Sequence, residues 1–227
     1  MNDLKDSKNM QANTVSSKGQ LDQNRYVKLF QRGGTKRVLF FGNSITRHGP
    51  KESIGWSGDW GMAASCREKD YVHLVISELD KKYGTVDYCI AQGAEWERRY
   101  PETDAILEEH YTAARDFAAD IVIIRIGENI PSEEHERVNC KPYLDQAVKF
   151  LAQNATQVIM TDLFYYSAKN NVFSEVAEEN GYTFVHLTDL ENDERTMALG
   201  LFEHDGVAHH PGDFGMQCIA ERIVAKM

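Results

Sequence analysis

Short apolar runs recur along the chain and are separated by longer polar or mixed segments. Each run has the length of a strand, and the run at 120–127, "DIVIIRIG", is apolar almost throughout. A continuous apolar run is typical of a strand that is covered on both faces of its sheet. The pattern predicts five strands, at residues 37–42, 86–93, 120–127, 156–163 and 182–187.

Helical spacing of apolar residues fills the segments between these strands. The clearest case is 142–154, where apolar residues recur every three or four positions. Another helix is expected to end at Gly181, because glycine is favoured just beyond helix C-termini. Helices are predicted around 61–83 and at 103–119, 142–154, 174–181 and 215–227.

Strands that alternate with helices pair in parallel through right-handed crossovers. The predicted fold class is therefore α/β, a three-layer α/β/α sandwich with a five-stranded parallel sheet of the flavodoxin-like kind. In open sheets of this kind, ligands bind beyond the carboxyl ends of the strands. A functional site is expected at that edge.

The first twenty residues differ from the rest of the chain. Residues 1–20 are polar and almost free of large apolar side chains, which predicts a disordered tail. Residues 21–227 are predicted to form a single domain, because 227 residues with 42% hydrophobic content suit one core and no repeat or linker interrupts them. The stretch 25–30, "RYVKLF", is expected to pack on this domain as a short arm, and it leaves a homodimer open.

The formal net charge of -10 argues against nucleic acid and anionic membranes as partners, since both attract clustered Lys and Arg. No apolar run reaches the roughly 18 residues that a membrane-spanning helix needs. The first residues lack the apolar core of a secretory signal. We therefore expect a cytoplasmic protein, with secretion through a signal removed from a longer precursor as the open alternative. Reduced thiols are expected at the widely spaced Cys66, Cys89, Cys140 and Cys218.

Three residues with the chemistry of acyl transfer follow predicted strands. Ser44 comes directly after the first strand, Gly93 ends the second, and Asn129 follows the third. In acyl transfer a serine hydroxyl attacks a carbonyl carbon, and nearby N–H donors stabilise the oxyanion that forms. The sequence alone leaves open that Ser44 and Gly93 are ordinary turn residues and that Asn129 caps the chain ahead of Pro131.

A histidine-rich loop at 202–216, "FEHDGVAHHPGDFGM", precedes the last predicted helix. A loop in this place can return to the same sheet edge, where a histidine would act as a base toward Ser44. No metal site is expected, because the spacing fits no standard zinc pattern. No cofactor is expected either, because no strand is followed by a glycine-rich nucleotide-binding motif. The candidate side chains in the loop are His204, Asp205, His209, His210 and Asp213.

These blocks resemble the SGNH hydrolases, also called the GDSL-like lipase/acylhydrolase family. "FFGNSIT", the glycine after the second strand, "GEN" after the third and the late "HHPGDFGM" match the family's Ser, Gly, Asn and His blocks in order, over about residues 36–227. The resemblance implies the SGNH fold, with Ser44 as nucleophile and His210 as general base and then acid. It also implies an oxyanion hole formed by the backbone N–H groups of Ser44 and Gly93 and the Asn129 side chain.

The acid of the catalytic triad departs from the family pattern. The family usually places an aspartate three residues before the histidine, but Val207 stands there and Asp205 lies five residues before His210. Asp205 is the predicted acid if the loop bulges. Otherwise Glu203 or a backbone carbonyl orients the ring, as in a dyad, and His209 remains an alternative base.

Loops at the same edge carry the three tryptophans of the chain. Trp56, Trp60 and Trp96 are predicted to contact substrate, because tryptophan faces suit sugar rings. Packing over the core is the alternative for all three. The charge-rich stretch 132–139 is expected to be a solvated loop. Substrate contact and simple solvation both stay open for the loop charges Asp59, Glu95 and Arg98.

The leading hypothesis is a cofactor-free serine esterase. It would cleave a small acyl ester through an acyl-enzyme intermediate. The leading candidate for the substrate is an acetyl ester of a carbohydrate or of another small molecule. A lipase or thioesterase of the same fold is one alternative. A non-catalytic flavodoxin-like binding or scaffold protein is another, but it leaves the shared position of Ser, Gly, Asn and His without a reason.

Overall fold

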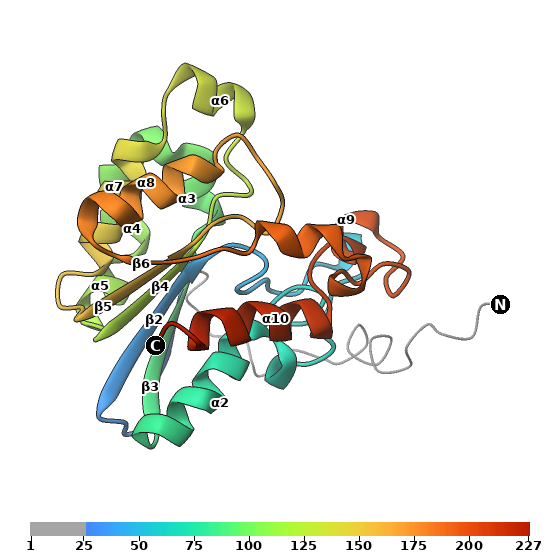
Figure 1. The fold of residues 1–227 in the computed structure, drawn as a ribbon, viewed down its shortest axis with the longest axis horizontal. Coiled ribbons are helices and arrows are strands. Elements are labelled where there is room, and N and C mark those ends of the chain that lie inside the picture. Colours follow the sequence, from blue (N-terminus) through green and yellow to red (C-terminus); the bar gives the residue numbers. More distant parts are fainter. Residues whose placement is uncertain (1–25) are drawn as a thin grey trace.

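A six-stranded sheet forms the centre of the computed structural model, which describes residues 26–227 (Figure 1). The strand order is β1-β3-β2-β4-β5-β6. The strands are β1 (Val27–Phe30), β2 (Lys36–Gly42), β3 (Val86–Gln92), β4 (Ile121–Arg125), β5 (Gln157–Thr161) and β6 (Thr183–Val185). The tail predicted at residues 1–20 lies outside the described residues.

The five predicted strands all form and pair in parallel, which confirms the α/β fold class. The predicted strand count is corrected from five to six, because the expected arm forms β1 and pairs antiparallel with β3, with Val27 opposite Ala91. The backbone N–H groups of Arg32 and Gly34 donate to Asp87 Oδ1 at 2.6 and 2.9 Å and hold the link from β1 to β2. Four residues are too few for alternation to distinguish an edge strand from a packed arm.

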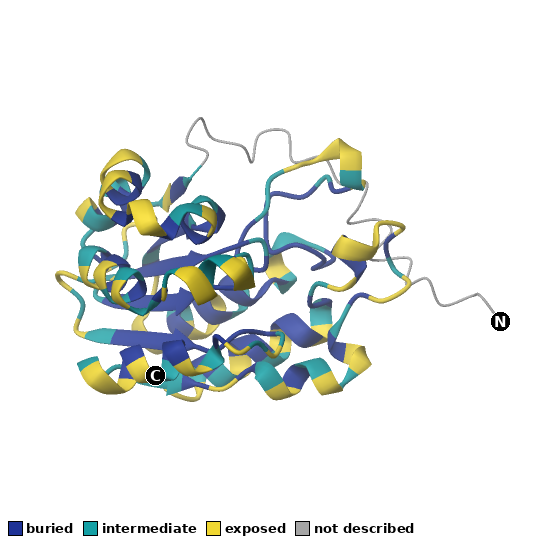
Figure 2. Cartoon of the chain, turned by 90° about the horizontal axis from the view of Figure 1, so that it is seen from above, coloured by how far each residue is buried: buried dark blue, intermediate teal, exposed yellow. Residues whose placement is uncertain are grey.

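Helices cover both faces of the sheet. One face carries α2 (Tyr71–Tyr83) and α10 (Asp213–Val224), and the other carries α4 (Thr103–His110), α5 (Thr112–Asp116), α7 (Lys141–Leu151) and α8 (Asn170–Asn180) (Figure 1). Along β2, Val38 and Phe40 pack toward the first pair, while Leu39 and Phe41 pack toward the second group. Buried residues accordingly run along the strands and the inner sides of the helices (Figure 2). The result is the predicted three-layer sandwich.

Short helices account for most differences from the predicted elements. They are α3 (Ala94–Arg99), α6 (Ser132–Arg137) and α9 (Asp205–Ala208). The predicted solvated loop at 132–139 is corrected to α6, in which Arg137 pairs with Glu134 at 2.6 Å. A helix of one or two turns holds too few apolar residues for its period to be visible in sequence.

The longer helices also differ in their ends. The helix predicted at 103–119 is divided into α4 and α5 at the buried Tyr111, whose hydroxyl donates to the Gln92 carbonyl at 2.8 Å. Helix α8 ends at Gly181 as predicted, with a φ of 67° that glycine adopts without strain. Within the described range, no helix is long and apolar enough to cross a membrane.

The carboxyl ends of β2, β3 and β4 lie next to one another. Gly42 pairs with Gln92 on one side and with Arg125 on the other. A side chain at position 42 would overlap Thr46 Oγ1 and lie 2.5 Å from the Arg125 carbonyl, so only glycine fits there. The segments that leave these three strands are therefore held together at one edge of the sheet.

Candidate active site

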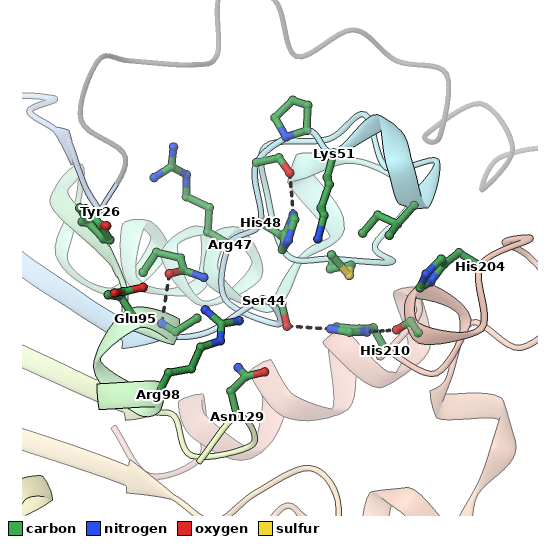
Figure 3. A pocket seen from close by; sticks show the side chains of 17 residues that line it. Tyr26, Ser44, Arg47, His48, Lys51, Glu95, Arg98, Asn129, His204 and His210 are labelled. Atoms are coloured by element: carbon green, nitrogen blue, oxygen red, sulfur yellow. Dashed lines mark hydrogen bonds between the residues drawn. The ribbon is translucent and has the colours of Figure 1, made fainter. Parts of the chain in front are cut away.

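A cavity of about 830 Å³ opens at this edge (Figure 3). Most of its lining comes from the segments after β2, β3 and β4 and from the loop before α10, and Tyr26, just before β1, adds to it. Ser44, Asn129 and His210 line it, as do Glu95 and Arg98. The edge that the parallel-sheet rule indicates is thus the edge that carries the cavity.

Ser44 stands in a tight turn directly after β2. The backbone N–H groups of Thr46 and Arg47 both donate to the Asn43 carbonyl, at 3.0 Å each, and these bonds close the turn. The turn directs Ser44 Oγ into the cavity, where it lies 2.7 Å from His210 Nε2 (Figure 3). A serine and a histidine that are 166 residues apart in sequence therefore share a hydrogen bond.

The second ring nitrogen of His210 faces a backbone carbonyl. Nδ1 lies 2.6 Å from the carbonyl oxygen of Gly206, which belongs to α9. A carbonyl oxygen only accepts hydrogen bonds, so Nδ1 carries the proton and Nε2 keeps a lone pair. Nε2 therefore accepts the hydrogen bond from the Ser44 hydroxyl.

The environment of His210 keeps its imidazole neutral. Burial lowers the pKa of His210 to about 4, and the nearby His48 and Arg125 act in the same direction. The hydrogen bond to Gly206 acts the other way but is outweighed. Since an unperturbed histidine has a pKa of about 6.5, the ring at neutral pH is ready to accept a proton.

Asp205 does not contact the His210 ring, and this corrects its prediction as the orienting acid. Its side chain is exposed at the start of α9, and its backbone carbonyl accepts from Nδ1 of His209 at 2.8 Å. Residues 205–208 form one helical turn, α9, which places the carbonyl of Gly206, four positions before His210, against the ring. Of the two adjacent histidines, His210 is the one that reaches Ser44.

Asn129 lines the cavity, and its side chain is positioned by a hydrogen bond to the buried Glu97. Asn129 Nδ2 donates to Glu97 Oε2 at 2.5 Å, and the backbone N–H groups of Asn129 and Gly127 donate to Oε1 at 3.2 and 2.6 Å. An amide nitrogen has two hydrogens, so one remains for a ligand in the cavity. Glu97 is completely buried in α3 and was not among the residues predicted from sequence.

Glu97 belongs to a buried polar cluster beneath the cavity. Asn43 Nδ2 donates to Glu97 Oε1 at 2.9 Å and to Glu128 Oε2 at 2.5 Å, and Arg125 donates to both Asn43 and Glu128. Burial and the nearby Glu128 raise the pKa of Glu97. Burial also acts to raise the pKa of Glu128, but Arg125 and the hydrogen bonds outweigh it and lower that pKa. A feature of the sequence that could have indicated this cluster is the charged Arg125 at the end of the otherwise apolar strand β4.

The backbone N–H of Gly93 is engaged within the sheet, which corrects the expectation that it is free. It donates to the Gly42 carbonyl at 2.6 Å and so continues the ladder between β2 and β3. Gly93 also has a packing role, since a Cβ there would overlap Ile126 and lie 2.8 Å from a ring carbon of Phe41. The donors next to the cavity are therefore the Ser44 N–H and the Asn129 side chain.

The three tryptophans do not reach the cavity, so their predicted contact with substrate is corrected to core packing. All three are at most 1% exposed, and their ring N–H groups donate inside the protein, to His48, Ala64 and Thr103. Trp56 and Trp60 pack edge to face, with centroids 5.7 Å apart. Large apolar rings gain most from full burial, and here the loops fold back far enough to provide it. The tryptophans are Trp56, Trp60 and Trp96.

Comparisons with known proteins identify the fold. No protein-family model and no curated protein sequence matches the chain. Among solved structures, a variant of Axe2, an acetyl xylan esterase from Geobacillus stearothermophilus, is similar with a TM-score of 0.54 and 20% identity, over 86% of this chain and 95% of that one.

Two further solved structures support the same fold. LAE5, an alpha/beta hydrolase enzyme from the metagenome of Lake Arreo, has a TM-score of 0.56 and 16% identity, over 85% of this chain and 95% of that one. A putative lipolytic protein of the G-D-S-L family from Desulfitobacterium hafniense has a TM-score of 0.50 and 14% identity, over 85% of this chain and all of that one. The chain thus has the SGNH hydrolase fold, as the sequence motifs implied.

Proposed function

We propose that this protein is a serine esterase that removes a small acyl group, in the first place acetyl, from a carbohydrate or another small alcohol. The observation that carries the proposal is the distance of 2.7 Å between Ser44 Oγ and His210 Nε2 in the wall of the cavity. The fixed tautomer of the ring makes Nε2 the proton acceptor, which is the role that a base beside a serine nucleophile needs.

In the acylation step, His210 Nε2 takes the proton of the Ser44 hydroxyl while Oγ attacks the ester carbonyl carbon. The carbonyl oxygen becomes negatively charged and is stabilised by the Ser44 N–H, which meets no acceptor in residues 26–227, and by the free N–H of Asn129. The C–O bond to the alcohol then breaks, and His210 returns its proton to the alcohol oxygen. Acetyl remains on Ser44.

In the deacylation step, water replaces the alcohol. His210 removes a proton from the water, the hydroxide oxygen attacks the acyl carbon, and the same donors stabilise the second oxyanion. The bond to Ser44 Oγ breaks and Oγ regains its proton from His210. The Gly206 carbonyl orients the ring in both steps, so this machinery is a Ser–His dyad with a backbone orienting group.

The acetyl and sugar parts of the proposal are supported by the acetyl xylan esterase among the similar structures. They are also supported by the cavity lining, which places Arg47, Lys51, Glu95 and Arg98 around Ser44. A long acyl chain would need an extended apolar surface, whereas these side chains favour a polar substrate. A lipase or thioesterase is therefore the second choice.

A fluorophosphonate probe tests the proposal, because it phosphonylates a serine that a neighbouring base activates. The wild type should be labelled, and Ser44→Ala should not. Ser44→Ala should also lose about ten-thousandfold or more in kcat on 4-nitrophenyl acetate, because removal of the nucleophile costs at least as much as removal of the group that orients the histidine. Ser53→Ala, which changes an exposed serine in a nearby loop, is the matched control and should behave as wild type.

The alternatives give different results. Absence of labelling and of ester hydrolysis in the wild type would favour a binding or scaffold protein. Faster turnover of long-chain esters or thioesters than of acetylated xylo-oligosaccharides would favour a lipase or thioesterase. The location of the protein in the cell stays a prediction from sequence.

A further inference from the structure

Positive charge is concentrated in the cavity, although the chain as a whole is acidic. Histidines aside, the charged side chains that line it in the described part of the chain are three cations and one carboxylate, namely Arg47, Lys51, Arg98 and Glu95. The formal net charge of the protein is -10. A local surplus of cations against such a background attracts anions to this one place.

Two of the cations have no ion-pair partner in residues 26–227. These are Lys51, in the loop after β2, and Arg98, in α3. Figure 3 shows both side chains directed toward the space in front of Ser44, from different sides. Both charges are close enough to His48 to lower its pKa, after the larger effect of burial.

The remaining charges do not cancel this surplus. Arg47 shares the buried Asp59 with Lys28, at 2.8 and 2.7 Å, so two cations face one carboxylate. The carboxylate of Glu95 is paired with Arg99 at 3.1 Å and is thus partly neutralised.

We propose, on the basis of the esterase function above, that the substrate carries an anionic oxygen group that Lys51 and Arg98 bind. Because an acetyl group has no room for a charge, the anionic group belongs to the alcohol part of the ester. A carboxylate, as in an acidic sugar, and a phosphate, as in a sugar phosphate, have this chemistry in common. Arg98 can bind either with two parallel hydrogen bonds, and Lys51 adds a point charge.

The expected size of the preference for an anionic substrate depends on how exposed the two cations are. Lys51 and Arg98 are both exposed, so water and salt screen their charges. An exposed ion pair contributes up to about fivefold in an equilibrium. Two such pairs therefore predict a preference of about tenfold in kcat/KM for an anionic over a neutral ester, decreasing as salt is raised.

The test compares three acetyl esters that differ at one position of the alcohol: 4-acetoxybenzoate, 4-acetoxyphenyl phosphate and the neutral 4-acetoxybenzamide. Each kcat/KM is divided by the rate of alkaline hydrolysis of the same ester, which removes differences in leaving group. The wild type should prefer at least one anionic ester by about tenfold at about 0.02 M salt, and the preference should shrink at about 0.5 M. The better of the two identifies the group as carboxylate or phosphate.

Variants assign the preference to the two side chains. The double variant Lys51→Gln with Arg98→Gln should lose the preference, so that its kcat/KM falls about tenfold more on the preferred anionic ester than on 4-acetoxybenzamide. Lys81→Gln, which removes one exposed positive charge from α2, should keep the preference. Equal turnover of all three esters by the wild type, or a preference that survives in the double variant, would overturn the inference. Hydrolysis of none of them would instead refute the esterase function on which it rests.

Discussion

The His210 ring is held by a carbonyl dipole where a serine triad has a carboxylate. A full negative charge beside the ring would raise its pKa, because it would stabilise the imidazolium. Here burial is the largest influence and lowers the pKa of His210 to about 4. Such a base is weak but stays unprotonated over a wide range of pH.

The first prediction concerns the dependence of activity on pH. Protonation of Nε2 abolishes its role as base, so kcat/KM for 4-nitrophenyl acetate should fall as pH drops through the pKa of His210. That fall should be centred near pH 4 rather than near 6.5, the ordinary value for histidine. Circular dichroism at each pH separates this fall from unfolding. A half-maximal rate near pH 6.5 would contradict the prediction.

The second prediction concerns Asp205. Because its side chain is exposed and Nδ1 of His210 meets the Gly206 carbonyl, Asp205→Asn should retain kcat within about threefold of wild type. A carboxylate that orients the histidine of a triad costs orders of magnitude when it is replaced by an amide. A loss of more than about a hundredfold would therefore show that Asp205 reaches the ring during turnover.

The third prediction concerns Glu97 as a positioning residue for Asn129. Every group bonded to its carboxylate is an N–H donor, so Glu97→Gln would set an amide NH₂ against another donor. We expect kcat to fall about tenfold or more with KM nearly unchanged, because the Asn129 amide would turn away from the oxyanion. The free energy of unfolding should fall by about 1–3 kcal/mol.

Glu102→Gln is the matched control for Glu97→Gln, since Glu102 is exposed and pairs with Arg99 at the surface. It should change neither kcat nor the urea midpoint measurably. If Glu97→Gln raised KM and left kcat unchanged, the carboxylate would act on substrate binding and not through Asn129.

At the scale of whole elements, sequence patterns identified the long buried strands and helices but not the short helices. The parallel strands are visible because each must be apolar on both faces, as in the fully buried β4. Helix α3 has six residues, four of which are charged. Its sequence, "AEWERR", therefore does not show that Glu97 is the charged residue that faces inward. Helix α9 is shorter still, with four residues, and the role of its Gly206 carbonyl cannot be inferred from a pattern of side chains.

The candidate site, like the fold, could be predicted from the sequence only in part. Ser44 and Asn129 could be placed because each follows a strand whose position at the sheet edge is fixed by parallel pairing. His210 could be placed because its loop precedes the last helix and matches the histidine block of the SGNH hydrolases. The positions of the tryptophans could not be predicted, because the sequence does not distinguish a tryptophan that faces a ligand from one that packs in the core. Which of the two applies depends on how far each loop folds back, and this is a property of tertiary packing.

The fourth prediction concerns the junction of β3 and α3. In Gly93→Ala the new methyl group would overlap Ile126 and crowd the Phe41 ring, so unfolding free energy in urea should fall by about 1–3 kcal/mol. Gly212→Ala is the control, because its methyl group would meet its nearest neighbour at an ordinary 3.4 Å. Equal stability of the two variants would show that the core under β3 adapts to the added volume.

At the scale of the whole molecule, the short edge strands matter for how copies of the chain meet. The sheet is bounded by β1, with four residues, and by β6, with three. The strand behind β1 is β3, a seven-residue strand that is largely buried. A long apolar strand left open at an edge is a template for aggregation, and β1 occupies that position here.

The fifth prediction follows from this arrangement. A chain that begins at Gly33 lacks β1 and also the ion pair of Arg32 with Asp80 at 2.6 Å. Light scattering should show that it forms large particles on standing, while a chain that begins at Tyr26 stays dispersed. Equal behaviour of both would mean that β3 is protected by something other than β1.

We therefore expect the four-residue strand β1 to protect the sheet from fibre-like growth, in addition to its part in the fold. Both edge strands are short, so few backbone N–H and C=O groups are available to pair with a strand of a second copy and extend the sheet across a symmetry axis. Any homodimer of this chain is then expected to meet through helix or loop surfaces, and the sheets of the two copies would stay separate.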